Sequence, residues 1–183
     1  MTRYKALDAM RGLTIALMIL VNTPGSWSHV YAPLLHADWH GCTPTDVIFP
    51  FFMFIIGSAM FFSFKKTNST ANASQVLRLI KRGAIIFAVG LALNIYPFTT
   101  SIENLRILGV LQRIGIAYIL ASICVLLLNR RGVISLSVAI LIAYWLLLLS
   151  VGSNNAYTLE NNLVRSVDIA VLGESHLWQG KGL

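Results

Sequence analysis

Residues 47–64 read VIFPFFMFIIGSAMFFSF and contain no charged side chain. A helix needs about 20 predominantly apolar residues to cross the roughly 30 Å hydrocarbon core of a bilayer. This stretch therefore predicts a membrane-spanning helix. Four other segments are also mainly apolar and of similar length, at about 10–27, 83–98, 107–128 and 133–151, although the first contains Arg11 and the third Arg113. The expected fold class is an all-α, multi-pass transmembrane helical bundle with about five spans.

The composition of the whole chain agrees with this prediction. Of its 183 residues, 56% are hydrophobic and 11% are charged, whereas soluble domains are about 45–50% apolar and about 25% charged. This balance excludes a soluble globular enzyme, a disordered chain and a nucleic-acid-binding module. The lipid bilayer is therefore an expected partner, and nucleic acid is not.

The net charge of +7 is unevenly distributed along the chain. Most of its cations lie in three places, namely the N-terminal tail, the expected loop 65–82 and the turn before 133–151. They are Arg3, Lys5, Arg11, Lys65, Lys66, Arg78, Lys81, Arg82, Arg130 and Arg131. Lysine and arginine accumulate on the cytoplasmic side of membrane proteins, so the N-terminus is expected to be cytoplasmic. The same basic face could instead bind a phosphorylated cytosolic donor.

This orientation divides the chain into two parts. Residues 1–151 form the expected transmembrane part, and 152–183 form an extracytoplasmic tail. Within the tail, Leu159, Leu163 and Val167 recur every four residues, and Gly173 follows them. The pattern predicts a short amphipathic helix that stops at Gly173.

The segment 36–46, HADWHGCTPTD, carries the first candidate chemistry. Histidine changes charge near neutral pH, so His36 can serve as a general base, a metal ligand or a structural donor. Asp46 can cap the next helix together with Thr43 and Pro44. It can also orient a histidine in a carboxylate–imidazole pair, and the two roles are compatible. The pattern is short and lacks the HExxH signature, so no metal site is expected.

A second set of candidates lies inside the expected spans. Arg113 is placed about six residues into the span 107–128, at a depth of roughly 9 Å. A charge at that depth is costly, so it should face a partner or a water-filled cavity. Gln112 precedes it, and Asn22 and Asn94 lie in other spans. Hydrogen bonds between helices would also account for the two asparagines.

Several motifs, taken in chain order, resemble the heparan-alpha-glucosaminide N-acetyltransferase family. They are LDAMRGL at 7–13, HADWHGCTPTD at 36–46, RILGVLQR at 106–113 and VDIAVLGESHLW at 167–178. The resemblance implies a multi-pass acyltransferase with acetyl-CoA as its cytosolic co-substrate. The expected acceptor is an amino sugar or glycan on the opposite side of the membrane.

The resemblance implies that His36 is the active-site histidine. We expect Asp46 to hold its imidazole in place. We also expect Arg113, Gln112, Asn22 and Arg11 to bind the acetyl-CoA donor or line its route.

Family members continue beyond the HLW motif, so this chain is expected to be the N-terminal half of such an enzyme. Short loops favour the inner (plasma) membrane of a bacterial cell. A partial bundle would gain from pairing, which makes a homo-oligomer an expected state. The competing function is that of a non-catalytic membrane protein, either a transporter-like half or a scaffold subunit.

Overall fold

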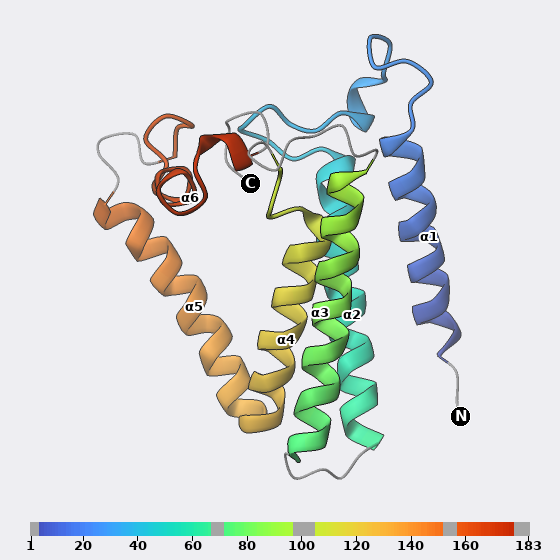
Figure 1. Ribbon diagram of the computed structural model, residues 1–183, viewed down its shortest axis with the longest axis vertical. Coiled ribbons are helices and arrows are strands. Elements are labelled where there is room, and N and C mark those ends of the chain that lie inside the picture. Colours follow the sequence, from blue (N-terminus) through green and yellow to red (C-terminus); the bar gives the residue numbers. More distant parts are fainter. Residues whose placement is uncertain (1–3, 67–71, 97–104, 152–156, 178–183) are drawn as a thin grey trace. The chain divides into compact units, whose positions relative to one another are not determined.

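The computed structural model describes residues 4–66, 72–96, 105–151 and 157–177, and within these ranges every regular element is a helix and there is no strand. The expected all-α class is confirmed. Six α-helices follow one another (Figure 1): α1 (Lys5–Asn22), α2 (Ile48–Lys66), α3 (Ala73–Ile95), α4 (Val110–Leu127), α5 (Arg130–Val151) and α6 (Leu163–Leu172). Short 3₁₀ helices lie at η1 (Ala32–Leu34), η2 (Pro44–Val47) and η4 (Glu174–His176).

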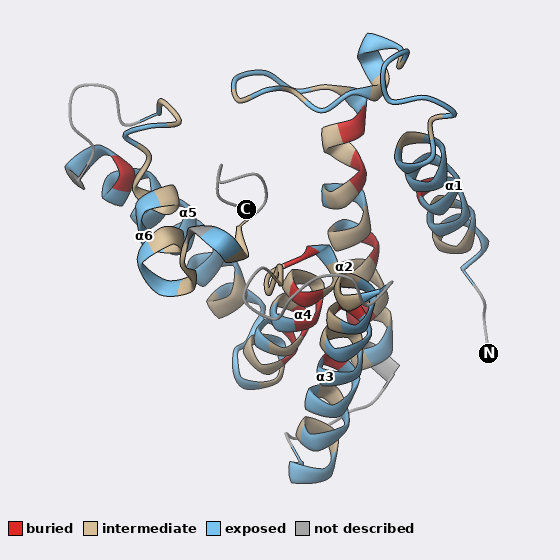
Figure 2. Cartoon of the chain, turned by 45° about the horizontal axis from the view of Figure 1, so that its top comes forward, coloured by how far each residue is buried: buried red, intermediate tan, exposed pale blue. Residues whose placement is uncertain are grey.

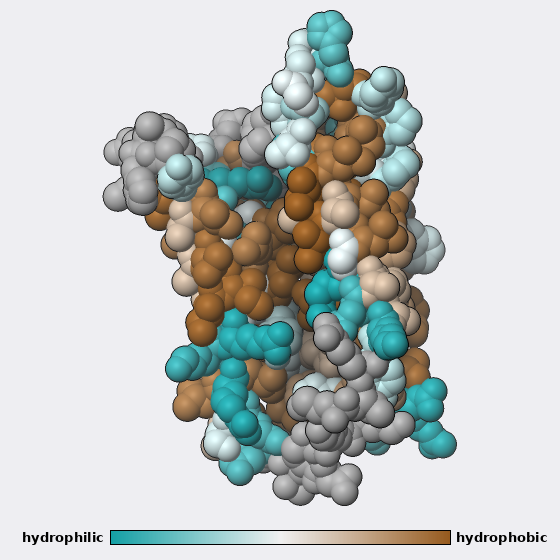
Figure 3. Space-filling view, turned by 90° about the vertical axis from the view of Figure 1, so that its right-hand side faces the viewer, coloured by the Kyte–Doolittle hydropathy of each residue, from teal (hydrophilic) through white to brown (hydrophobic). Residues whose placement is uncertain are grey.

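Among the described residues, three helical stretches are long and apolar enough to cross a membrane. They are Pro44–Phe64, Val110–Leu127 and Arg130–Ser150. Large hydrophobic side chains are exposed along them, and Figure 3 shows brown, hydrophobic areas covering much of the surface. Helices α1 and α3 also lie where spans were predicted, but they carry charged residues. The number of five spans and the cytoplasmic N-terminus therefore stay predictions.

Helices α1 and α3 begin well before the hydropathy pattern predicts. Helix α1 starts at Lys5 and ends at Asn22, before Thr23 and Pro24, because a residue that precedes proline disfavours helical geometry. Helix α3 starts at Ala73, where the side chain of Asn72 accepts a hydrogen bond from the Ser74 N–H. The prediction of a loop over 65–82 was thus wrong at both ends, since α2 includes Lys65 and Lys66 and α3 includes 73–82.

The boundary between α4 and α5 also differs from the prediction. Helix α4 begins at Val110, so Arg113 lies in its first turn and not six residues into a span. Helix α5 begins at Arg130, where a turn was expected, because the Asn129 side chain accepts a hydrogen bond from Gly132 N–H at 2.8 Å. A capping side chain thus lengthens the helix beyond its apolar core.

The chain forms two compact units, residues 1–69 and 70–183. In the first unit α1 packs against α2, and the Tyr4 ring stacks on Phe62 with 4.0 Å between ring centroids. The buried residues of this unit include Thr14, Thr45, Ile48, Ile55 and Met60. Figure 2 shows that most of each helix is nevertheless exposed or only partly buried.

In the second unit α3 and α4 pack closely and run antiparallel (Figure 1). Glycines make this approach possible. A Cβ atom on Gly115 would lie 2.7 Å from the Gly83 carbonyl oxygen, and one on Gly83 would lie 2.9 Å from the Gly115 carbonyl oxygen. Small residues let membrane helices approach backbone to backbone in this way.

The tail contains α6, whose N-terminus is capped by the Asn162 side chain. The helix ends before Gly173, the residue at which the sequence predicts it to stop. Gly173 has a φ of 81°, a conformation that favours glycine at the end of a helix. Residues 152–156 and 178–183 of the predicted tail lie outside the described residues, as do residues 97–98 of the predicted third span.

Candidate functional site

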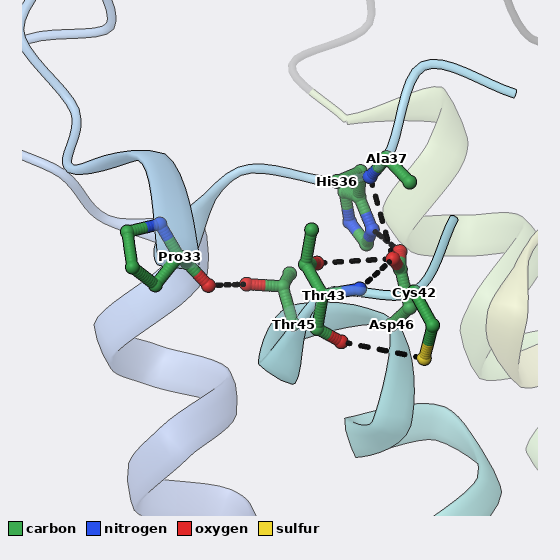
Figure 4. Close-up of polar contacts among 7 residues, drawn as sticks. All are labelled: Pro33, His36, Ala37, Cys42, Thr43, Thr45 and Asp46. Carbon is green, nitrogen blue, oxygen red and sulfur yellow. Dashed lines mark hydrogen bonds and ion pairs between the residues drawn. The ribbon is translucent and has the colours of Figure 1, made fainter. Parts of the chain in front are cut away.

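His36 and Asp46 form a hydrogen-bonded pair in the loop between η1 and α2. The His36 Nδ1 and Asp46 Oδ1 atoms are 2.7 Å apart. The imidazole is largely exposed, with 73% of its side chain accessible, whereas 28% of the Asp46 side chain is accessible. The two residues that the sequence nominated as a carboxylate–imidazole pair are therefore in direct contact (Figure 4).

The Asp46 carboxylate accepts three further hydrogen bonds through its second oxygen. Oδ2 lies 2.8 Å from the Thr43 backbone nitrogen, 2.9 Å from the Thr43 hydroxyl and 3.3 Å from the Ala37 backbone nitrogen. Hydrogen bonds of this kind stabilise the charged form of a carboxylate. Asp46 thus caps η2 and orients His36 at the same time, so its two predicted roles are combined in one geometry.

The fold of the loop brings the pair together. Gly41 has a φ of 119°, which lets the chain turn back between His36 and Thr43. Thr45 is 4% exposed, and its hydroxyl donates to the Pro33 carbonyl at 3.3 Å (Figure 4). This bond joins η1 to η2. Sequence reasoning missed Thr45, because a single threonine gives no sign of a partner 12 residues away.

The hydrogen bond to Asp46 sets the chemistry available to His36. A carboxylate can only accept, so Nδ1 carries the proton and Nε2 holds the free lone pair. In this tautomer Nε2 can act as a base or as a nucleophile. Since the imidazole is exposed, Nε2 is open to an external substrate.

Two predicted donor-binding residues of the same unit have partners within their own helix. Arg11 lies 3.4 Å from Asp8, three residues earlier on α1. Asn22 donates to the Met18 carbonyl at 2.9 Å and is exposed at the end of α1. The structure does not join either of them to the His36–Asp46 pair by a hydrogen bond, and their donor-binding roles stay predictions.

The other two predicted donor-binding residues lie in the second unit, on α4. Arg113 is partly buried, and the Asp168 carboxylate on α6 attracts it electrostatically. Gln112 is 1% exposed and fills the space beside Gly90 and Gly109. A Cβ atom added to Gly90 would lie 2.8 Å from the Gln112 Oε1 atom, and one added to Gly109 would lie 2.7 Å from it. Its Nε2 has no hydrogen-bond partner within the described ranges.

The segment before α4 is held by side chains from two distant elements. Asn94 on α3 donates to the Arg106 carbonyl at 2.8 Å, and His176 in η4 donates through Nδ1 to the Leu105 carbonyl at 2.6 Å. Burial, together with the positive charge of Arg113, lowers the pKa of Arg106. The hydrogen bond of Asn94 goes to the segment before α4 and not, as predicted, to another helix. The His176 contact spans 71 residues and has no signature in the sequence.

In the described part of the chain, no three histidine, cysteine or acidic residues are grouped so that they could hold a metal ion. His40 and Cys42 are exposed in the same loop as His36. No helix forms over 36–42, so the four-residue spacing of His36 and His40 does not place them on one helical face.

Every regular element in the ranges that the structure describes is a helix, and three helical stretches there are long and apolar enough to cross a bilayer. The model of the catalytic domain of heparan-alpha-glucosaminide N-acetyltransferase matches residues 3–172. The chain belongs to this family, and the resemblance inferred from its motifs is confirmed.

Two curated relatives bear the name heparan-alpha-glucosaminide N-acetyltransferase. The human protein is 32% identical over 135 residues, which make up 70% of this chain and 20% of the human protein. The mouse protein is 30% identical over 126 residues, or 66% of this chain and 19% of the mouse protein. The chain thus spans about a fifth of the length of these relatives.

Proposed function

We propose that this chain belongs to a membrane acyltransferase that moves an acetyl group from cytosolic acetyl-CoA to an amino sugar or glycan on the opposite side of the membrane. The observation that carries the proposal is the His36–Asp46 hydrogen bond at 2.7 Å inside the matched catalytic region. The family's name supports acetyl transfer to the amine of a glucosaminide.

In the direct mechanism, His36 acts as a general base. Its Nε2 removes a proton from the acceptor amine as the amine nitrogen attacks the thioester carbonyl. The new N–C bond forms, the C–S bond breaks, and the thiolate of CoA leaves. Asp46 stabilises the imidazolium that results, because its carboxylate already accepts a hydrogen bond from the Nδ1–H group and stays ionised.

In the two-step mechanism, His36 acts as a nucleophile. Nε2 attacks the thioester, CoA leaves as a thiolate, and an acyl-imidazole remains. The acceptor amine then attacks the acyl carbon, the bond from that carbon to Nε2 breaks and frees the imidazole, and the proton lost by the amine passes to the CoA thiolate or to solvent. Both mechanisms require the same tautomer, so the geometry around Asp46 supports both.

The proposed topology follows the charge distribution. The N-terminus is cytoplasmic, residues 1–151 form the transmembrane part with five spans, and 152–183 form an extracytoplasmic tail. The proposed location is the inner (plasma) membrane. We also propose that two copies pair, because large hydrophobic side chains are exposed on every long helix.

The test is acetyl transfer by the purified chain in proteoliposomes. Radiolabelled acetyl-CoA is supplied on one side and glucosamine on the other, and labelled N-acetylglucosamine is measured. Labelled product supports the proposal. Binding of acetyl-CoA or flux of the sugar without any labelled product contradicts it and favours a non-catalytic membrane protein.

Replacing Asp46 with asparagine is expected to lower kcat by about 100-fold, because the amide cannot stabilise an imidazolium. The KM for acetyl-CoA should not change, since Asp46 acts through His36 and does not bind the donor. Steady-state kinetics in proteoliposomes measure both constants. Asp38→Asn, an exposed carboxylate in the same loop, is the matched control and should retain full activity. If Asp46→Asn lowers the amount of folded protein but leaves kcat unchanged, Asp46 caps η2 and has no role in catalysis.

Replacing Arg113 with leucine is expected to weaken acetyl-CoA binding by about tenfold or more, because a hydrogen bond to a charged group contributes roughly 1.5–3 kcal/mol. Isothermal titration with the detergent-solubilised protein measures the affinity. Arg131→Leu removes the same charge from the exposed start of α5 and serves as the control. An unchanged Kd with intact helical content would assign Arg113 to packing alone.

A further inference from the structure

Three cations form a stripe on α3. Arg78, Lys81 and Arg82 are exposed and are spaced three and four residues apart, so they share one helical face. We call them the α3 basic stripe. They belong to a helix, and not to the loop that the sequence predicted.

The contacts between α3 and α4 determine how deep this stripe lies. The Arg82 guanidinium carbon lies 5.3 Å from the centroid of the Tyr118 ring, an arrangement typical of a cation–π interaction. Tyr118 is eight residues after the start of α4 and nine before its end. At 1.5 Å per residue, Arg82 is level with the middle of α4, about 12 Å from either end.

Helix α4 is one of the three helices able to cross a membrane. A cation near the middle of such a helix carries a high cost in hydrocarbon, roughly 3 kcal/mol in insertion experiments. The cation–π contact holds the guanidinium beside Tyr118, so Arg82 does not extend toward the nearer end of the helix. The Arg82 guanidinium must therefore have water or an anion beside it.

No carboxylate on the neighbouring helices balances these charges. Helices α3, α4 and α5 contain no aspartate or glutamate. The acidic residue that attracts Arg113 is Asp168, on α6. Arg113 itself lies five residues from Tyr118 toward the start of α4. Positive charge thus extends along α4 from its middle to its first turn.

We propose that the α3 basic stripe lines an aqueous inlet and binds the phosphate groups of a soluble CoA thioester on its way to Arg113. This inference rests on the proposed function, because it assumes that the donor is a CoA thioester. Charge-assisted hydrogen bonds from arginine and lysine suit phosphate oxygens. A CoA molecule carries several phosphates on an elongated chain, which matches a row of cations better than a single one.

The test is the affinity of the purified full chain for CoA, measured by isothermal titration for Arg82→Gln and Lys81→Gln. Each variant is expected to raise the Kd for CoA about tenfold, the effect of losing one charge-assisted hydrogen bond. Affinity for pantetheine, which has no phosphate, should stay the same. Arg165→Gln, on α6 and outside the basic face, is the control and should bind CoA normally. Two variants are used because Arg82 also contacts Tyr118.

Other outcomes separate this inference from the proposed function. Normal CoA binding by both stripe variants overturns the inference, even if acetyl transfer is observed. The inference is also overturned if both variants bind CoA normally but no longer bind nanodiscs with anionic phosphatidylglycerol more tightly than neutral nanodiscs. In that case the α3 basic stripe binds lipid headgroups. Stripe-dependent CoA binding without acetyl transfer supports the inference and contradicts the proposed function.

Discussion

Replacing His36 with alanine is expected to reduce acetyl transfer about 10³-fold, within the range of 10²–10⁴ that a positioned acid–base group contributes. The physical reason is that Nε2 is the basic imidazole nitrogen that the hydrogen bond to Asp46 leaves available. Because 73% of the imidazole is exposed, its removal takes little packing away. The amount of folded protein should therefore stay the same while turnover is lost.

The measurement is the rate of labelled product formation in proteoliposomes, alongside circular dichroism of the same preparations. His40→Ala is the matched control, because His40 is an exposed imidazole four residues further along the same loop. It should retain its activity. Turnover by His36→Ala at the wild-type rate would remove His36 from the mechanism.

Replacing Gly115 with leucine is expected to destabilise the α3–α4 pair by about 3 kcal/mol, because overpacking a tight contact typically costs 1–3 kcal/mol or more. The obstacle is main chain and cannot rotate away. A Cβ at this position would lie 2.7 Å from the Gly83 carbonyl oxygen and 3.2 Å from the Phe87 nitrogen. The helices would have to separate, and Arg113 and Gln112 would move with α4.

Thermal unfolding in detergent measures this effect, and Tm should fall by roughly 5–10 °C. Gly57→Leu is the control, since it also places leucine in an apolar helix, and a Cβ on Gly57 would meet nothing within 4 Å. Gly115→Ala should give an intermediate fall. Equal Tm values for Gly115→Leu and Gly57→Leu would refute the close α3–α4 approach.

Much of the candidate site followed from local sequence. The segment Thr43 to Asp46 is a capping pattern, and the structure contains η2 there with Asp46 bound to the Thr43 N–H. The nomination of His36 as the partner of Asp46 also matches the observed distance of 2.7 Å. Both contacts lie within ten residues along the chain, so the conformational possibilities were few.

Other features could not be predicted from the sequence. The 65–82 region looked like a loop because its cations and asparagines are polar, yet Asn72 caps a helix that runs through Arg78 and Arg82. Polar residues form helices readily when a cap and tertiary packing support them. The hydrogen bond from His176 to the Leu105 carbonyl joins two residues that are 71 positions apart, and no sequence motif connects them.

The sequence by itself determined the helical class, the approximate places of the long helices and the family. These depend on hydropathy and motifs, which are properties of consecutive residues. The tertiary structure alone decided that Gly83 meets Gly115, that Arg82 lies over Tyr118, and that His176 holds Leu105. Such contacts depend on the register at which two helices or segments pack, and this register is set by the fit of many side chains at once.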